Sequence, residues 1–556
     1  MNGPLPPPAP SLRACVVVPA RDEEGRIGAC LDALAAQEGV PRADFEVILV
    51  VDRCTDATVD RAIATGRTHP GLRLHVLAAD APGAGAARRR GMDEAARRLG
   101  RSGRGPGLIA STDADTRPRP DWLRRQLALV DAGAQAIGGL IDVEAGEAGV
   151  EVLHRRAGRL EARARAAGAG AGGHPFFSGA SLGVTVAAYR AAGGLRPLHA
   201  LEDQALERSL AERGIPIVRA RDVRVVTSGR TDGRARHGLA ADLRLDDWST
   251  RRTYRAADWE PAELAALKRG TVSVILPARE VAGTIGAILD AIAPLERLGL
   301  VDELLVVDAA SRDGTAAVAR AHGARVVQES EVLPDAGPCR GKGDAMWRGL
   351  AATEGDVVAY VDADTLDFGA SFVTGLLGPL IDDPGVALVK GAFRRPLRAG
   401  DALLEDEGGR VTELVARPLL AILAPELGGL VQPLAGEQAA RRDLLEAIPF
   451  PVGYGIETSM LLDALALRGL DAIAQVDLGT RQNRHQPLRE LGAMSLAVMG
   501  AGLRRGLPAE VWEGFAAGRM RSPAPGGGSA VRDVPLDERP PLAERLRMEG
   551  QAACSA

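Results

Sequence analysis

Two pairs of aspartates occur with the same spacing in this 556-residue chain. They are Asp113 with Asp115, and Asp362 with Asp364, and each pair follows a short apolar run. Side chains alternate along an extended segment, so both carboxylates of a pair point to one face. Paired carboxylate oxygens suit a hard divalent cation, and a cation there can hold a diphosphate. For a single pair, a turn or helix cap is the favoured interpretation.

The elements around each aspartate pair also repeat. VVVPARDEEGRIGACLDAL from Val16 aligns with VILPAREVAGTIGAILDAI from Val274, and each predicts a strand, a turn and a helix. FEVILVVD from Phe45 and DELLVVD from Asp302 follow, and then the aspartate pairs. Because three landmarks recur in one order, the repeat favours cation binding over turn capping. The alternation predicts an α/β fold with a mostly parallel, doubly wound sheet in each half, with ligands at the carboxyl ends of the strands.

Composition and charge exclude several classes of protein. With 46% hydrophobic residues, 25% charged residues and a net charge of -5, the chain lacks the basic surplus of a nucleic-acid binder. Five cysteines without zinc-ligand spacing, and an N-terminus without a signal-peptide core, predict a cytoplasmic protein. No apolar run is long enough for a transmembrane segment, so any membrane attachment is expected to be peripheral.

Taken in order, the motifs resemble those of GT-A-type glycosyltransferases, which are nucleotide-diphospho-sugar transferases with a Rossmann-like fold. We expect two tandem domains of this type, and the first, residues 11-240, resembles glycosyltransferase family 2. The resemblance implies that the base and ribose lie against Pro19, Ala20, Glu23 and Asp52. It also implies that Asp113 and Asp115 bind the metal and, through it, the donor.

An acidic pair in the first half, Glu202-Asp203, fits the one that precedes the acceptor-side helix in this family. The resemblance implies that Asp203 is the catalytic base, which takes the proton of the acceptor hydroxyl. An acid stabilised by the dipole at a helix N-terminus is an equally weighted alternative. Several arginines are candidate diphosphate clamps or else solvate a helix face: Arg88, Arg89, Arg90, Arg234 and Arg236.

The second half, residues 271-505, carries a longer series of motifs. The segments are GKGDAMW from Gly341, DAD from Asp362, VKG from Val389 with RRP from Arg394, GGRVTELVARP from Gly408, QPLAGE from Gln432 and VGYGIE from Val452. Together they resemble glucosyl-3-phosphoglycerate synthase, which transfers glucose with retention from UDP-glucose to the 2-hydroxyl of 3-phosphoglycerate. The resemblance implies UDP-glucose or GDP-glucose as donor, 3-phosphoglycerate as acceptor, and Mg²⁺ or Mn²⁺ as cofactor.

The same resemblance assigns site residues in the second half. The donor-binding residues are Pro277, Ala278, Glu280, Asp308, Lys342 and Asp362, and the metal ligands are Asp364 and His485. The acceptor-binding residues are Arg394 (with Arg395 as a second possibility), Gly409, Arg410, Val411 and Thr412, and Glu457 is catalytic. Backbone N–H groups, a guanidinium and a hydroxyl in the GGRVT segment suit a small phosphorylated acid. Considered alone, that segment is a tight turn before a helix.

Three positions depart from the family pattern. Val281 and Ala309 stand where the nucleotide-binding turns usually carry polar residues, and Asn483 stands at the metal-binding histidine. His485 lies two residues further on, so in an extended segment it faces the same way and either binds the metal or contacts the acceptor. A catalytically silent nucleotide-sugar-binding module in one half is therefore the alternative to two active transferases.

Two further segments complete the expected organisation. Residues 241-270 are expected to form a helical linker, and residues 520-556 a disordered tail rich in Pro, Gly, Ser and charge. A homodimer is possible on this interpretation, and neither segment is assigned any chemistry.

Overall fold

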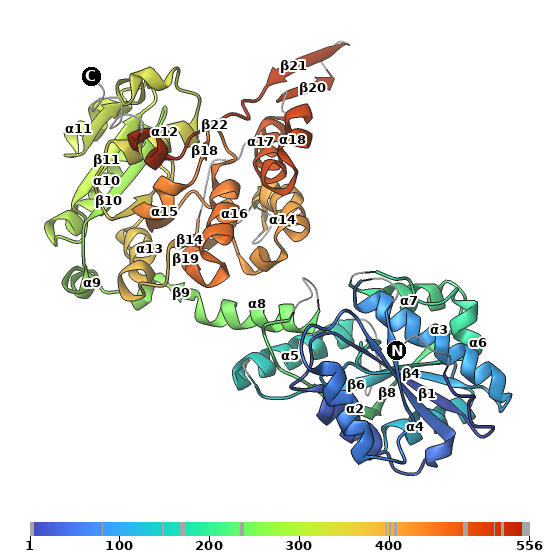
Figure 1. The fold of residues 1–556 in the computed structure, drawn as a ribbon. Coiled ribbons are helices and arrows are strands. Elements are labelled where there is room, and N and C mark those ends of the chain that lie inside the picture. Colours follow the sequence, from blue (N-terminus) through green and yellow to red (C-terminus); the bar gives the residue numbers. More distant parts are fainter. Residues whose placement is uncertain are drawn as a thin grey trace. The chain divides into compact units, whose positions relative to one another are not determined.

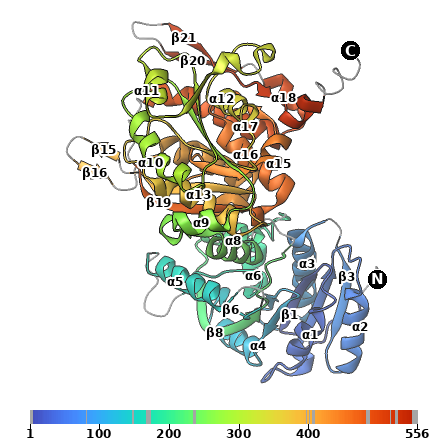
Figure 2. The ribbon, with the colours of Figure 1, turned by 90° about the vertical axis from the view of Figure 1, so that its left-hand side faces the viewer.

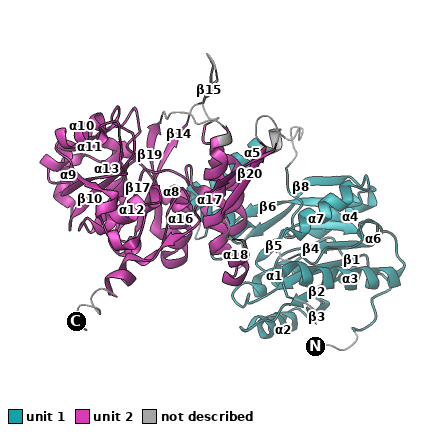
Figure 3. Ribbon diagram, turned by 90° about the horizontal axis from the view of Figure 1, so that it is seen from above, with its two compact units in different colours: residues 1–247 teal, residues 248–556 magenta. Residues whose placement is uncertain are grey.

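The computed structural model forms two compact units, residues 1–247 and 248–556 (Figure 3). Each unit has one eight-stranded sheet with helices packed on it (Figures 1 and 2). In the part of the chain that is described, no helix is both long and apolar enough to cross a membrane. The described residues are 5–79, 82–146, 149–166, 174–198, 200–233, 238–395, 397–399, 402–404, 408–481, 488–515, 518–523 and 528–547.

The sheet of unit 1 has the strand order β3-β2-β1-β4-β7-β6-β8-β5, and only β7 is antiparallel to both of its neighbours. Its strands are β1 (Ala14–Ala20), β2 (Phe45–Val51), β3 (Leu74–Ala78), β4 (Leu108–Ser111), β5 (Thr116–Pro118), β6 (Ala136–Val143), β7 (Leu182–Thr185) and β8 (Ile217–Thr227). Its helices are α1 (Ile27–Ala35), α2 (Thr58–Thr68), α3 (Ala84–Ser102), α4 (Trp122–Asp131), α5 (Val150–Ala166), α6 (Val186–Ala191), α7 (Glu202–Ala211) and α8 (Leu239–Arg251), the last of which ends in unit 2.

Alternation along the strands of unit 1 builds a core on each face of the sheet. In β1, Val16 and Val18 pack with α1, α2 and α4, whereas Cys15 and Val17 pack with α3, α6 and α7. A strand buried on both faces reads as a continuous apolar run, as the sequence of β1 does. The carboxyl ends of the strands are thereby left for polar turns.

Unit 2 repeats this arrangement with the order β12-β11-β10-β13-β17-β14-β19-β9, where β17 is antiparallel to both neighbours. Its sheet strands are β9 (Thr253–Arg255), β10 (Val272–Ala278), β11 (Glu303–Asp308), β12 (Arg325–Gln328), β13 (Val357–Tyr360), β14 (Leu388–Arg394), β17 (Gln438–Arg441) and β19 (Ile473–Thr480). The first seven strands of the two sheets correspond one to one, so the repeat predicted from the sequence is confirmed.

The helices of unit 2 include α10 and α13 on one face of the sheet and α12 on the other. They are α9 (Pro261–Leu267), α10 (Ile285–Arg297), α11 (Thr315–Ala321), α12 (Lys342–Ala351), α13 (Ala370–Asp382), α14 (Arg417–Leu423), α15 (Arg442–Ala447), α16 (Ile456–Arg468), α17 (Leu488–Gly506) and α18 (Ala509–Phe515). Short strand pairs are formed by β15 (Leu397–Ala399) with β16 (Ala402–Leu404), β18 (Phe450–Pro451) with β22 (Glu538–Arg539), and β20 (Arg519–Pro523) with β21 (Ser529–Asp533).

A glycine in each unit lets a helix approach the central strand closely. A Cβ on Gly91 of α3 would lie 2.4 Å from Val17, and one on Gly349 of α12 would lie 2.7 Å from Ile275. We expect each glycine-to-alanine change to lower the free energy of unfolding of its own unit by about 1–3 kcal/mol, because the core must shift to admit the methyl group. Denaturant unfolding with hydrogen exchange measures this for each unit. Gly158→Ala in α5, where no atom lies within 4 Å, is the control and is not expected to destabilise; equal losses in all three variants would contradict the packing argument.

The expected helical linker is partly built into unit 2. β9 pairs with β19 at the edge of the second sheet, and the indole of Trp248 donates a hydrogen bond to the carbonyl of Ile473 at 2.8 Å. The prediction of a helical linker over 241-270 is therefore wrong at β9. A strand of three residues is too short to show an alternation in the sequence.

The expectation of a disordered tail over 520-556 is also wrong at β20, β21 and β22. β22 pairs with β18, and the guanidinium of Arg539 donates to both carboxylate oxygens of Asp344 at 2.8 and 2.7 Å. The indole of Trp347 donates to the carbonyl of Pro540 at 3.0 Å. The proline and arginine residues that suggested disorder therefore bind two side chains of α12, those of Asp344 and Trp347.

Candidate active sites

Unit 2 contains a cavity of about 940 Å³ at the carboxyl ends of β10, β11 and β13. The residues that the motif series placed in one site share its walls: Pro277, Ala278, Lys342, Asp362, Asp364, Gly409, Arg410, Val411, Thr412 and Glu457. They come from the ends of two strands, the first turns of two helices, and the segment before α14. The doubly wound sheet therefore brings residues 180 positions apart in sequence to one cavity.

Lys342 bridges two carboxylates on the cavity floor. Its Nζ lies 2.7 Å from Oδ1 of Asp362 and 2.8 Å from Oε1 of Glu457. Burial alone disfavours the ammonium, but the charges of Asp362 and Glu457 outweigh it and raise the pKa of Lys342 above its usual value. Lys342 is the first residue of α12 and Glu457 lies in the first turn of α16, so two helix starts converge on Asp362.

Arg481, directly after β19, holds the aspartate pair from the other side. Its guanidinium lies 3.1 Å from Asp362 and 3.5 Å from Asp364, and it also pairs with Glu437, which is fully buried. Burial opposes ionisation of Asp362, yet Lys342 and Arg481 hold its pKa below the ordinary range. The sequence interpretation did not assign Arg481 or Glu437. One signal in the sequence could have indicated Arg481: the motifs contain several acidic residues, and buried acids require a buried cation.

The aspartate pair of unit 2 fits a divalent cation. The side chain of Asp364 is 60% exposed, and Arg481 approaches one of its oxygens only to 3.5 Å, so the carboxylate faces the cavity. Desolvation within the cavity and the charge of Asp362 raise the pKa of Asp364 above its usual value, against the opposing charges of Arg481 and Lys342. His485 and Asn483 lie outside the described residues.

Unit 1 repeats the bridging cation with a different side chain. Arg88, in the second turn of α3 and only 3% exposed, lies 2.7 Å from Asp113 and 3.0 Å from Glu202. Arg88 is therefore an internal support, and the expectation that it clamps a diphosphate is wrong because its donors are already engaged. Arg89 is exposed and lies 3.5 Å from Asp93 on the helix surface.

The second aspartate of unit 1 is more covered than its counterpart. Arg230 lies 3.1 Å from Asp115 and 2.7 Å from Glu23, and the Asp115 side chain is 14% exposed. Burial and then Asp113 raise the pKa of Asp115 to about 6, against the opposing effect of Arg230. Asp203 accepts hydrogen bonds from the backbone N–H groups of Gly179 at 3.1 Å and of Gln204 at 2.8 Å.

Comparison with known proteins shows related sequences in both units. The family model "Glycosyltransferase like family 2" matches residues 10–257, and "Glycosyl transferase family 2" matches residues 273–400. The chain belongs to glycosyltransferase family 2. It is accordingly a glycosyltransferase with two tandem GT-A-type domains, as the motifs predicted.

About half of this glycosyltransferase is closely similar to curated glucosyl-3-phosphoglycerate synthases. It is 48% identical over 305 residues to the enzyme of Mycolicibacterium paratuberculosis, covering 53% of this chain and 92% of the relative. It is 47% identical over 300 residues to that of Mycolicibacterium smegmatis, covering 53% and 97%. Since unit 1 has only 247 residues, the matched region must include residues of unit 2.

Solved structures also match about half of the chain. Glucosyl-3-phosphoglycerate synthase from Mycobacterium tuberculosis, in complex with Mn²⁺ and UDP-glucose, is 46% identical with a TM-score of 0.47, covering 52% of this chain and 95% of that chain. Mannosyl-3-phosphoglycerate synthase from Rubrobacter xylanophilus is 47% identical with a TM-score of 0.49, covering 54% and 98%.

Three residues expected in the donor or acceptor sites of this glycosyltransferase are not among the residues that line the cavity. Arg394 is exposed and does not line the cavity, whereas Arg395 does, because successive residues of an extended strand face opposite sides. The carboxylate of Glu280 accepts the backbone N–H of Arg312 at 2.8 Å. Asp308 is buried and accepts the side-chain amide of Gln328 at 2.8 Å. Glu280 and Asp308 thus shape the turns beside the cavity.

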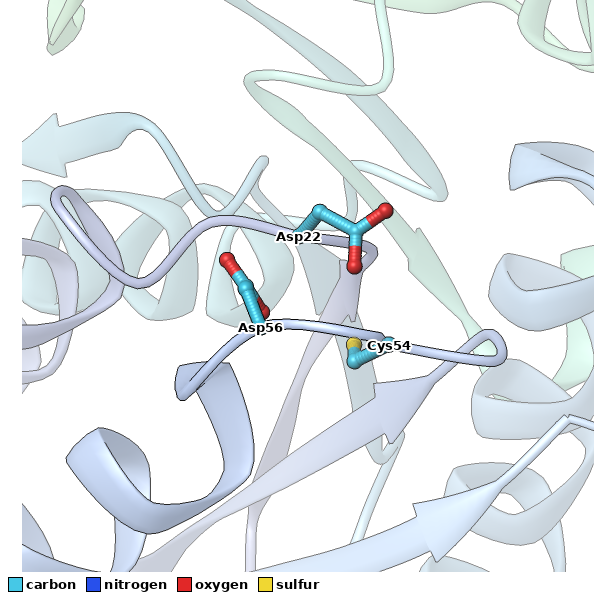
Figure 4. Close-up of side chains that lie close together, drawn as sticks. All are labelled: Asp22, Cys54 and Asp56. Carbon is cyan, nitrogen blue, oxygen red and sulfur yellow. The ribbon is translucent and has the colours of Figure 1, made fainter.

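The remaining expected donor residues of unit 1 line its corresponding strand ends. Pro19 and Ala20 end β1, and the carboxylate of Asp52, after β2, accepts the backbone N–H of Gly83 at 2.8 Å. A group of possible metal ligands among the described residues, Asp22, Cys54 and Asp56, comes from the two loops after these strands (Figure 4). Asp22 accepts the N–H of Thr55 at 2.6 Å and Asp56 that of Glu24 at 3.0 Å, so the two acids hold the loops together.

A fully buried lysine behind the cavity supports the wall next to Asp362. Lys390 of β14 donates to the carbonyl of Ala435 and to the side-chain oxygen of Gln438, both at 2.6 Å. Burial lowers the pKa of Lys390 to about 7. Between those two partners lies Gly436, where a Cβ would lie 2.3 Å from both carboxylate oxygens of Asp362. The backbone at Gly436 therefore fixes the position of Asp362.

Proposed function

We propose that unit 2 transfers glucose from UDP-glucose to the 2-hydroxyl of 3-phosphoglycerate and so forms glucosyl-3-phosphoglycerate. The observation that carries this proposal is the single 940 Å³ cavity, which collects the donor turn, Lys342, the aspartate pair and the Gly408–Thr412 loop. The 48% identity to an enzyme of that name supports the same substrates. GDP-glucose is the alternative donor.

The residues of the cavity divide into a donor side and an acceptor side. Asp362 and Asp364 would hold Mg²⁺ or Mn²⁺, which neutralises charge on the leaving diphosphate. Lys342 and Arg481 keep Asp362 ionised and in place for that role. Glu457 lines the cavity within reach of Lys342, and we assign it as the catalytic carboxylate of the transfer.

The acceptor side combines a turn with polar side chains. Gly409 has φ +75°, which favours glycine, and its turn is followed by Arg410 and by Thr412, which is buried. Backbone N–H groups of such a turn, together with a guanidinium, bind the phosphate or carboxylate of a small acid. Arg395 lines the same part of the cavity and takes the role expected of Arg394.

Unit 1 is proposed to be a second transferase domain, fused to the domain that makes glucosyl-3-phosphoglycerate. Asp203 is its proposed catalytic base, and the site does not identify its acceptor. The bridge from Arg88 to Asp113 and Glu202 supports this role, because it repeats the bridge that Lys342 makes in unit 2. A silent docking module would not need a buried cation at this position. The covered Asp115 is the observation that favours the alternative.

The direct test uses the purified full chain with Mg²⁺, 3-phosphoglycerate and either UDP-glucose or GDP-glucose. We expect a product with the mass of phosphoglycerate plus one hexose, formed from UDP-glucose. Replacing 3-phosphoglycerate by 2-phosphoglycerate is the control, because the 2-hydroxyl is then blocked and no product should form. Release of nucleotide without a glucosylated phosphoglycerate would refute the proposal.

A further inference from the structure

A buried carboxylate stands at one end of the unit 2 cavity without a complete set of partners. Glu329 directly follows β12, is 4% exposed and lines the cavity. Its Oε1 is buried and accepts no hydrogen bond from any residue that the structure describes. Leaving a buried carboxylate oxygen unpaired costs free energy, so such an atom on a cavity wall indicates a missing donor.

The order of the strands places Glu329 at the end of the cavity away from the acceptor. The aspartate pair follows β13, and β10, β11 and β12 lie in turn on one side of β13, whereas β17 and β14 lie on the other. Three inter-strand spacings separate β13 from β12, roughly 14 Å. This is the reach of a ribose and base that extend from a diphosphate held at the aspartates. The loop that begins at Gly408 lies on the opposite side, because the N–H of Gly408 donates to the carbonyl of Arg395, directly after β14, at 2.9 Å.

The residues that line the cavity after β10, β11 and β12 carry apolar groups or hydrogen-bond donors, apart from Glu329. Val281, Ala309 and Ala310, which follow β10 and β11, also line the cavity and have apolar side chains. Arg279, Ser330 and Cys339 line it as well, and their side chains carry donor groups. Among these side chains Glu329 is the one carboxylate. Burial and then the charge of Asp344 raise the pKa of Glu329, while the neighbouring Cys339 thiol and the charges of Arg348 and Arg279 oppose this.

We propose that Glu329 recognises the base of the donor nucleotide by accepting its ring N–H, and so selects uracil and rejects cytosine. Uracil carries a hydrogen on N3, whereas N3 of cytosine presents a lone pair that a carboxylate repels. Guanine also carries a ring N–H, and GDP therefore belongs among the test ligands. This inference rests on the proposed donor site of unit 2.

The test measures how UDP, CDP and GDP inhibit the formation of glucosyl-3-phosphoglycerate, a readout that reports only the site making this product. In the natural protein we expect UDP to inhibit about a hundredfold more strongly than CDP, because the site rejects a base lacking the hydrogen. Glu329→Gln supplies an amide that can donate to cytosine N3. In this variant we expect the ratio of inhibition strength between UDP and CDP to become about tenfold smaller or more. We also expect a higher KM for UDP-glucose, with kcat within about twofold of that of the natural protein.

Glu331→Gln is the matched control, because Glu331 lies two residues away, is exposed, and should change neither the ratio nor the KM. If Glu329→Gln does not fold, Glu329→Asp is the second variant. It keeps a carboxylate acceptor but places it further from the base, so it should weaken inhibition by UDP without strengthening inhibition by CDP. An unchanged ratio in the folded variant, or GDP inhibiting more strongly than UDP, overturns the inference. Failure of the natural protein to form the product instead overturns the proposed function, so the two failures are distinguishable.

Discussion

Asp364→Asn is expected to lower the rate of glucosyl-3-phosphoglycerate formation about a thousandfold or more, while Asp115→Asn changes it less than about threefold. An amide in place of the exposed carboxylate removes an anionic ligand from the expected cation, and with it the charge stabilisation of the leaving diphosphate. Asp115 belongs to unit 1 and should not affect this product. Initial rates with product identified by mass, at saturating UDP-glucose and Mg²⁺, measure both variants.

The paired design separates the two units. Both substitutions preserve volume, and unfolding midpoints should confirm that each variant is folded. A large loss in Asp115→Asn with none in Asp364→Asn would move the activity to unit 1 and contradict the assignment. Normal rates in both variants would show that neither aspartate pair serves this reaction.

Gly436→Ala is expected to lower the same rate about a hundredfold or more without unfolding unit 2. The added methyl group would stand 2.3 Å from both oxygens of Asp362, so that carboxylate must move away from Lys342 and Arg481. Displacement of a catalytic group by about an ångström costs on this order. Initial rates together with the unfolding midpoint separate displacement of Asp362 from loss of fold.

Gly369→Ala provides the matched control for this prediction. Gly369 stands just before α13 in the same unit, has an extended backbone, and a Cβ there would meet only the Ser371 hydroxyl at 3.6 Å. Its rate should equal that of the natural protein. Full activity of Gly436→Ala would show that the segment can shift without moving Asp362, and would contradict the argument.

The features that could be predicted from the sequence are those with a short period or a local motif. The alternation of predicted strands and helices predicted both sheets. The apolar run before Asp362 and Asp364 placed this pair at the end of a strand. Arg481 and Lys390 could not be predicted, because their partners lie up to 119 residues away and a buried cation has no local pattern. The sequence offered both Arg394 and Arg395 as acceptor ligands, and only Arg395 lines the cavity, a difference of a single residue along the strand.

The two units also show why residue-by-residue comparison of a repeat has a limit. Lys342, at the first position of α12, and Arg88, in the second turn of α3, each bridge the first aspartate of a pair to an acid of a following helix. The arginine side chain is longer than that of lysine, so Arg88 can reach its two acids from one turn further along its helix. The interaction is therefore repeated although the sequence position and residue type are not.

The contact of Arg539 with Asp344 ties the start of the catalytic helix to residues synthesised almost two hundred positions later. During translation, Arg348 is available to pair with Asp344 as soon as α12 has been made, whereas the second arginine partner of Asp344 is missing until Arg539 leaves the ribosome. A nonsense mutation before Arg539, or proteolytic trimming of that segment, would therefore yield a protein with every catalytic side chain and a weakened support beneath Lys342.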